Sequence, residues 1–409
     1  MTFPYMIQRI KRQPLAVVLL FGLNFVTALL LCVLHTGSIR LNEQIDAVYD
    51  NATVTCQVSS ITGTQCDNLH LPEWVIRLFF GKSCIPNSSG ISFSDDADAE
   101  RFLTYIADAY AKVSIKGQFR GGSVNIIGIT DIEADRALQE ENGCYITWQE
   151  PFNDAIFSGS DEYCVIPETM LTALSEAGNI EINFQSGDKA VTREFLAVGA
   201  HTGADDVIYC PWGITAQINR ELDGAIHADA ITAVLRDSRS VPEFWENAAG
   251  NYFVEPNPEG ELTPWEESPI YNNYPYALLV NDDKLEGTVS GLQNNLSFFR
   301  LCTTAMIVLS LIVGLVAGHL IVRKRTRALA LQQILGRSNG NIFAEILLEL
   351  AASTAIGIIT GIGLSCLMGV KDFPWSALLA SPALCILGIA SAIISILHKD
   401  LIRTIKEDA

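Results

Sequence analysis

Four long apolar stretches constrain this chain more than any other feature of its sequence. They cover residues 15–34, 301–322, 350–369 and 376–397, and none of them contains Asp, Glu, Lys or Arg. A helix that crosses a bilayer core of about 30 Å needs about 20 consecutive apolar residues. Buried helices of soluble proteins rarely keep such a length free of charge, so we predict four membrane-spanning helices.

A cleaved signal peptide is the alternative for the first stretch. Its apolar run, interrupted only by Asn24, is longer than the about 7–15 residues of a usual signal-peptide core. No A-x-A cleavage pattern follows it. We therefore expect a retained anchor.

Basic residues predict the orientation of the four helices. Arg9, Lys11 and Arg12 precede the first stretch, and neither this segment nor the loop 323–344 after the second stretch contains an acid. The basic residues of that loop are Arg323, Lys324, Arg325, Arg327 and Arg337. Cytoplasmic loops are enriched in Lys and Arg, so both segments and both termini are expected inside the cell.

This orientation predicts the layout of the whole chain. We expect a cytoplasmic N-terminus (1–14), transmembrane helix 1 (15–36), an extracytoplasmic domain with stalk helices (37–298), transmembrane helix 2 (299–322), a cytoplasmic loop (323–344), transmembrane helix 3 (345–369), a short external loop (370–375), transmembrane helix 4 (376–397) and a cytoplasmic C-terminus (398–409).

Charge is divided unevenly over this layout. The segment 37–298 has 40 acidic and 14 basic residues, a net charge of −26, whereas the rest of the chain has +7. An acidic exterior is typical of a solvated surface, and attraction of cationic peptides or drugs is the weaker alternative. The total of −19 argues against a nucleic-acid partner.

The exterior segment has the alternating and periodic patterns of a mixed α+β domain. We expect a helix from Asp95 or Asp98 to about Ala111, a second helix over 169–177 and a loop over 257–275. The expected strands are 54–58, 124–129, 163–166, 180–184, 194–198, 207–209, 230–235 and 276–280. The predicted fold class is therefore a membrane α-helical protein with four transmembrane helices and an inserted extracytoplasmic α+β domain on a helical stalk.

Six of the ten cysteines fall in this exterior segment: Cys56, Cys66, Cys84, Cys144, Cys164 and Cys210. An even number in an exported domain suggests up to three disulfides, and six cysteines allow fifteen pairings. Cys56–Cys66 and Cys144–Cys164 are two candidate bonds. A metal site is the rival interpretation, but no C-x-x-C pair or nearby histidine has zinc-ligand spacing.

An apolar seam runs into the second apolar stretch at heptad spacing: Leu285, Val289, Leu292, Leu296 and Phe299. A shorter stripe, Leu41, Ile45 and Val48, follows the first stretch. Two helices that pack along these seams would form a stiff stalk able to carry motion out of the membrane. An ordinary linker helix is the alternative.

Sequence motifs of catalysis are missing. The chain has no P-loop, no G-x-S-x-G, no H-E-x-x-H and no EF-hand loop, and its six histidines are scattered. We therefore expect no enzyme activity and no cofactor or metal. Gly314-x-x-x-Gly318 and Gly357-x-x-x-Gly361 allow close approach of helices, in packing or in dimerisation.

The loop between the second and third apolar stretches carries the most specific pattern. A basic anchor leads into an apolar helical segment, then to Gly336 and a polar turn, and an acid enters the next stretch. The pattern resembles the signature L-x-x-x-G-x-[ST]-x-x-x-I of the FtsX/MacB-like permease subunits of ABC transporters. The residues that lie along this signature are Gln332, which stands at the position of the leucine, Ile334, Leu335, Gly336, Ser338, Ile342 and Glu349. The order of one span, a large exterior domain and three spans also resembles that family.

The resemblance implies a permease that transmits mechanical force. A separate cytoplasmic ATPase subunit would press on the loop, and the exterior domain would move to export or extract a peptide, a lipid-linked molecule or an amphipathic toxin. A second permease copy or a related permease would complete the complex in a bacterial plasma membrane. The residues implied in coupling are Arg325, Arg327, Leu331, Ile334, Leu335, Gly336, Ser338, Ile342 and Glu349.

Other roles remain open at this point. The basic residues could instead hold the loop against anionic membrane lipid. Some relatives activate an exterior cell-wall hydrolase, which is one alternative function. An ATPase-independent membrane sensor is another. Six exterior cysteines are not a usual feature of the family.

Overall fold

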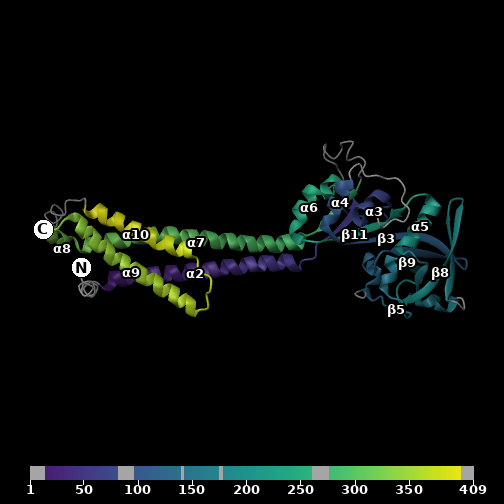
Figure 1. The fold of residues 1–409 in the computed structure, drawn as a ribbon, viewed down its shortest axis with the longest axis horizontal. Helices are drawn as coiled ribbons and strands as arrows, with labels where there is room; N and C mark the ends of the chain where they lie inside the picture. Colours follow the sequence, from purple (N-terminus) through teal and green to yellow (C-terminus); the bar gives the residue numbers. More distant parts are fainter. Residues whose placement is uncertain (1–13, 82–95, 140–141, 175–177, 260–275, 398–409) are drawn as a thin grey trace. The chain divides into compact units, whose positions relative to one another are not determined.

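The computed structural model describes residues 14–81, 96–139, 142–174, 178–259 and 276–397 (Figure 1). The chain divides into two compact units. Residues Met1–Val48 and Glu286–Ala409 form a helical unit, and Tyr49–Leu285 form a β-rich unit.

Within its described residues, the helical unit contains four long helices and one short one. The long helices are α2 (Pro14–Asn51), α7 (Asp283–Lys324), α9 (Asn339–Leu367) and α10 (Trp375–Leu397), and α8 (Thr326–Ile334) lies between α7 and α9 in the chain. All four long helices are long and apolar enough to cross a membrane. The prediction of four such helices is confirmed.

Two glycines of α9 pack directly on α2. A Cβ atom built on Gly357 would lie 2.7 Å from the carbonyl oxygen of Phe21, and one built on Gly361 would lie 2.8 Å from Cβ of Ala28. Such distances exclude any larger side chain unless the helices move apart. The small residues therefore set the α2–α9 separation.

Two glycines of α7 pack on α10 in the same way. A Cβ on Gly314 would overlap the backbone of Cys385, and one on Gly318 would lie 3.0 Å from Cβ of Ala392. The hydroxyl oxygens of Ser310 and Ser381 lie 2.8 Å apart across the same pair of helices. Both glycine motifs are thus used for packing within the chain.

The predicted seam residues lie on α7, where they divide between the two units. Val289 and Leu296 are buried, Leu292 and Phe299 are half-buried, and Leu285 packs against a core of the β-rich unit. The Phe299 ring lies 2.5 Å from a Cβ built on Gly37 of α2, so the two helices are in contact there. Their role as a moving stalk stays a prediction.

One mixed sheet dominates the β-rich unit. Its order is β12-β1-β11-β3-β4-β9-β6-β8-β5, and β7 pairs with both β3 and β8. The β4–β9 and β6–β8 pairs are parallel and the others antiparallel. The strands are β1 (Thr55–Ser60), β3 (Ile106–Phe119), β4 (Gly122–Ile129), β5 (Ile146–Trp148), β6 (Tyr163–Pro167), β7 (Asn179–Ser186), β8 (Lys189–His201), β9 (Val207–Pro211), β11 (Ala230–Leu235) and β12 (Tyr276–Asn281).

A separate two-stranded ribbon joins β2 (Leu71–Pro72) to β10 (His227–Ala228). The helices of the unit are α3 (Glu73–Phe80), α4 (Asp96–Tyr105), α5 (Trp212–Asp223) and α6 (Val241–Asn247). Short 3-10 turns are η2 (Ile132–Ala134), η3 (Arg136–Leu138), η5 (Asp154–Ser158), η6 (Glu168–Ala173), η7 (Ser238–Ser240) and η8 (Ala249–Asn251).

The predicted fold class, four transmembrane helices with an inserted α+β domain, is confirmed, and all eight expected strands are present. The helix expected to run to Ala111 is wrong in its second half, because α4 ends at Tyr105 and β3 begins at Ile106. Buried residues of β3 alternate at Ala111, Val113 and Ile115, which is strand periodicity. Sheet pairing on both sides of β3 overrides the helical spacing of its first residues.

Two further expectations are only partly within the described residues. The helix expected over 169–177 is the 3-10 segment η6, which ends at Ala173, and residues 175–177 lie outside the description. The loop expected over 257–275 lies outside it from residue 260 onward.

Candidate functional site

The strongest candidate site is the α8 corner, which we define as residues 323–349. The helix α7 ends at Lys324, the chain turns at Arg325, and α8 begins at Thr326. A hydrogen bond of 2.9 Å from the Arg325 amide to the Val322 carbonyl closes the turn. Four of the five basic residues of the predicted loop lie at this end of α7 and the start of α8. The Arg327 side chain lies outside the described structure.

A buried, two-pronged ion pair joins this turn to α9. Arg325 donates from Nη1 to Oε2 of Glu349 at 2.7 Å and from Nη2 to Oε1 at 2.8 Å. Only 11% of the Arg325 side chain and 4% of the Glu349 side chain is exposed. The hydrogen bonds that Arg325 donates to Glu349 raise the pKa of Arg325 above its ordinary value. This pair fixes both side chains in one geometry, because a guanidinium and a carboxylate match in a plane.

A second ion pair and a tight turn hold the other end of α8. The last turn has two hydrogen bonds of a Schellman motif, from the Gly336 amide to the Gln333 carbonyl (3.0 Å) and from the Arg337 amide to the Gln332 carbonyl (3.1 Å). Gly336 has a φ of 83°, which favours glycine. Arg337 then pairs with Glu345 of α9 at 2.6 Å.

The capping residue Ser338 starts α9 by accepting a hydrogen bond from the Asn341 amide at 3.4 Å. Ile342, four residues on, is buried in a core formed with α7, α8 and α10. Both residues of the predicted set therefore build the corner, and Ile342 lies in its interior rather than on its surface.

The helix α8 has one covered and one open face. Leu329 and Ala330 are buried, and Leu329 joins the core of the helical unit. Leu331, Ile334 and Leu335 are exposed, the last by 83%. Three neighbouring exposed apolar side chains beside a basic segment form a small patch suited to a protein partner.

The cysteines of the β-rich unit do not form the expected disulfides. All nine cysteines within the described residues are free thiols, and Cys84 lies outside them. The Cys56–Cys66 and Cys144–Cys164 bonds are absent from the described structure. Cys144 and Cys164 point into different cores, and Cys56 is buried on β1 whereas Cys66 lies in the segment after it.

Burial raises the pKa values of three of these thiols. It raises the pKa of Cys56 from 9.0 to about 12, and it raises the pKa values of Cys164 and Cys210 as well. The register of Val165 with Tyr209 places Cys164 and Cys210 opposite each other on β6 and β9. They behave as small apolar core residues in this structure.

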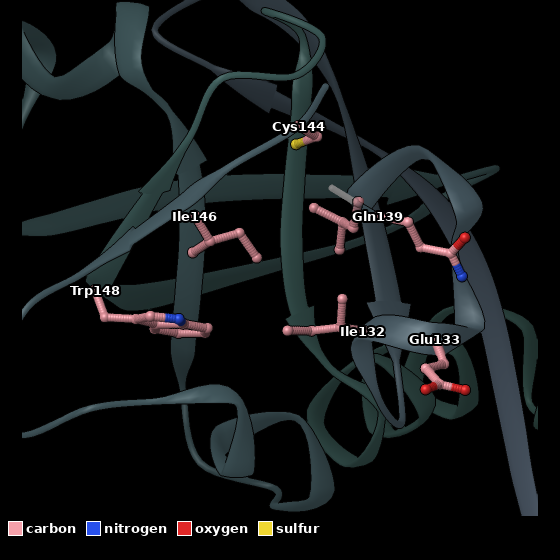
Figure 2. A pocket seen from close by; sticks show the side chains of 7 residues that line it. Ile132, Glu133, Gln139, Cys144, Ile146 and Trp148 are labelled. Carbon is pink, nitrogen blue, oxygen red and sulfur yellow. The ribbon is translucent and has the colours of Figure 1, made fainter. Parts of the chain in front are cut away.

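A second candidate site is a pocket of about 480 Å³ at the β5 edge of the sheet. Figure 2 shows Ile146 and Trp148 of β5 on one side and Ile132 of η2 on the other. Glu133 supplies the carboxylate among the seven residues that line the pocket. Its remaining lining residues are Leu138, Gln139 and Cys144. The walls suit a small apolar ligand with a group that binds a carboxylate.

A neighbouring pocket of about 430 Å³ is more polar. It shares Glu133 and Gln139 with the first and adds Lys112, whose amino group lies 3.4 Å from Oδ1 of Asp135. Burial and the nearby Glu133 and Asp108 carboxylates raise the pKa of Tyr110, which lines this pocket, to about 12. Sequence reasoning missed both pockets, because their residues come from separate turns and strands.

No family model and no curated protein matches this chain. Among solved structures it is similar to the periplasmic region of MacB from Actinobacillus actinomycetemcomitans, with 14% identity and a TM-score of 0.30 over 61% of this chain and 98% of that one. It is also similar to the extracellular domain of the noncanonic ABC-type transporter YknZ from Gram-positive bacteria. That match has 10% identity and a TM-score of 0.28 over 55% of this chain and 99% of the other.

At such low identities and TM-scores, the likenesses say nothing about activity. The function must therefore be argued from the geometry of the chain itself.

Proposed function

We propose that this chain is the permease subunit of an ABC transporter of the FtsX/MacB-like, force-transmitting type. The observation that carries the proposal is the α8 corner: a short helix with an open apolar face, tied to α9 by two ion pairs. A separate ATPase subunit would bind Leu331, Ile334 and Leu335. The chain itself would hydrolyse nothing.

The contacts of the α8 corner are suited to transmit force from α8 to the long helices. A force on α8 reaches α9 through the Arg325–Glu349 pair, because neither side chain can move without losing two charged hydrogen bonds in a buried setting. It reaches α7 and α10 through the core around Leu329 and Ile342. A loosely tethered loop would absorb the same force in its own motion.

The direction of transmission follows from the orientation proposed for the helices. The basic α8 corner and both termini would be cytoplasmic and residues 37–298 extracytoplasmic, in a bacterial plasma membrane. The paired seams of α2 and α7 would carry the motion to the β-rich unit. A second permease copy, or a related permease, would supply the opposing half, and membrane lipid would surround the helices.

A transported molecule would be handled outside the membrane rather than in a channel. The long helices have no charged residue in the four apolar stretches, and their close glycine contacts leave the α2–α9 and α7–α10 interfaces filled. A peptide, a lipid-linked molecule or an amphipathic toxin is the class of cargo that fits extraction at the outer face. Activation of an exterior cell-wall hydrolase would use the same motion.

The pocket beside Trp148 favours a second candidate function. A membrane sensor would bind a small ligand there and signal through the α8 corner without any ATPase. The two functions differ in the partner that α8 binds, and that difference is measurable.

The test is purification of the full chain in mild detergent from its own cell, followed by mass spectrometry. We expect an ABC-type ATPase at near-equal stoichiometry. Leu335→Asp should release it, whereas the same change at Leu171, an exposed leucine of the β-rich unit, should not. Gly336→Pro should also uncouple ATP hydrolysis, because proline cannot adopt a φ of 83°.

Two outcomes would overturn the permease proposal. One is co-purification of a signalling protein or a hydrolase without any ATPase. The other is unchanged ATPase binding and stimulation in both α8-corner variants, provided that they insert and fold normally.

A further inference from the structure

Three side chains of the β-rich unit converge: His70, His227 and Asp229. Their ligand atoms all lie within 4.8 Å of one another, and they are the one such group among the described residues. We propose that they bind a divalent transition-metal ion of the zinc type. The inference is independent of the proposed permease function.

Asp229 is the strongest evidence for a missing ligand. The residue is only 3% exposed, and its Oδ2 accepts a hydrogen bond of 2.7 Å from the Ser114 amide. Its Oδ1 is buried and has no hydrogen-bond partner within the described part of the chain. A buried carboxylate oxygen without a partner is costly, and a cation is the partner that compensates it best.

The histidines face that oxygen from a suitable distance. Nδ1 of His70 lies 3.6 Å from Oδ1 of Asp229, and the His70 and His227 rings meet at an angle of 63° with centroids 5.1 Å apart. Ligands about 2.0–2.1 Å from a tetrahedral zinc ion lie about 3.3–3.4 Å from each other. The separation of His70 and Asp229 is close to this value, and the three ligand atoms, which lie within 4.8 Å of one another, would draw together around an ion.

The composition of the group also indicates the metal. Imidazole nitrogens favour zinc, copper, iron and nickel, whereas calcium and magnesium prefer sites built of oxygen atoms. Two histidines and one carboxylate are three protein ligands, which leaves a fourth position open. Since 74% of the His70 side chain is exposed, water or an outside ligand can reach that position.

Backbone hydrogen bonds hold the three ligands in place. The β2–β10 ribbon pairs His227 with Pro72, two residues after His70 in the chain. The Leu69 amide donates to the Asp229 carbonyl at 3.0 Å, and the Asp229 amide donates to the Lys112 carbonyl at 2.8 Å. The bound ion would join the segment before β2 to the corner between β10 and β11.

The rival explanation is a simple ion pair between a protonated His70 and Asp229. An ion pair needs only those two residues, whereas a metal site also needs His227. Zinc binding must therefore depend on all three residues. That dependence separates the two explanations.

The experiment uses the full chain in detergent, purified with a tag that contains no histidine and stripped with a chelator. Zinc is titrated against a chromophoric competitor, and bound metal is counted by plasma mass spectrometry. We expect about one zinc ion per chain. His70→Ala, His227→Ala and Asp229→Asn should each weaken binding by at least about 100-fold, more than the roughly 10–100-fold typical of losing an outer partner.

His35→Ala, on α2 of the helical unit, is the matched control and should bind zinc like the parent chain. Cobalt should give a tetrahedral absorption band in the parent that is missing in His70→Ala. His70 is exposed, so this variant is expected to fold even if Asp229→Asn does not. Failure of the parent chain to bind zinc would overturn the proposal, as would binding by His70→Ala and His227→Ala that is as tight as that of the parent chain.

Discussion

The two units of this protein fill their interiors in opposite ways. The β-rich unit buries large rings, with Phe102 in contact with Phe79 and Phe244 at centroid distances of 5.0 and 5.3 Å. The helical unit brings backbones together at Gly357 and Gly314, where there is no room for a Cβ atom. Removing large apolar side chains from water is favourable in free energy. Removing them from lipid gains little, because lipid tails are as apolar as the side chains. Each unit therefore has the packing that its expected solvent favours.

The largest effect expected in the β-rich unit is that of Phe102→Ala. The ring is fully buried among four other aromatic residues, so its loss should cost about 3–5 kcal/mol. Hydrogen exchange resolved by segment should show loosening of the β-rich unit. Tyr145→Ala, at an exposed side chain, is the control and should change little.

Glu349→Gln tests whether a buried ion pair stabilises the helical unit as much as a buried aromatic ring stabilises the β-rich unit. Removing one partner from a buried ion pair typically costs about 3–5 kcal/mol, because the other charge stays buried. We expect faster exchange of α8 and the start of α9. The double variant Arg325→Met/Glu349→Leu should recover most of the stability but none of the ATPase coupling. Full coupling in the double variant would contradict the proposed path of force.

Two glycines of α9, Gly357 and Gly363, test whether close backbone contact stabilises the helical unit. Gly357→Leu should push α2 and α9 apart and cost about 1–3 kcal/mol or more, as overpacking does. Gly363→Leu on the same helix is the control, because a Cβ there has open space within 4 Å. Thermal inactivation in detergent should separate the two variants. Equal loss in both would mean that the α2–α9 contact does not set the packing.

Alkaline pH should weaken the β-rich unit through Cys56. The folded state holds the pKa of this thiol at about 12, against 9.0 as its ordinary value, so the folded state keeps a proton that the unfolded chain loses. The contribution is complete below pH 9 and falls by about 1.4 kcal/mol per pH unit above it. Unfolding measured between pH 8 and 11 should show a shallower slope in Cys56→Ala than in the parent chain.

The smallest effect on stability is expected at the open face of α8. Leu335→Asn changes an exposed side chain, so the free energy of unfolding should shift by less than about 0.5 kcal/mol. ATPase binding should nevertheless fall. A large loss of stability would show instead that Leu335 is part of the fold.

The sequence patterns predicted the elements that depend on local periodicity and length. The four long helices, the eight expected strands and the turn at Gly336 follow from apolar runs, alternation and a glycine in a left-handed conformation. The loop resemblance also named both Glu349 and Arg325 as coupling residues, but it did not predict that these two residues, 24 positions apart, form an ion pair. The spacing of residues within one segment does not reveal which residues of two helices will form a pair.

The predictions that were wrong or missing concern contacts between segments that are far apart in the chain. The predicted helix extends into β3, because the strand character of β3 depends on its pairing with β4 and β11 on either side. The predicted cysteine pairs were wrong because an even number of cysteines does not decide which thiols meet: Cys144 and Cys164 are buried in separate cores, and Cys66 lies outside the core that contains Cys56. His70, His227 and Asp229 lacked zinc-ligand spacing in the chain, and only the His-x-Asp spacing of the last two was visible in sequence.

By itself the sequence determined that this chain has four apolar helices, an acidic inserted domain and a basic loop with a family-like motif. These properties follow from composition and short-range periodicity, which any segment carries alone. Only the tertiary structure decided which helices touch at their glycines, that Arg325 locks α8 to α9, and that two histidines converge on a buried carboxylate. Such contacts depend on how the chain folds back on itself, because segments 24 or 159 residues apart meet only when the surrounding elements have packed.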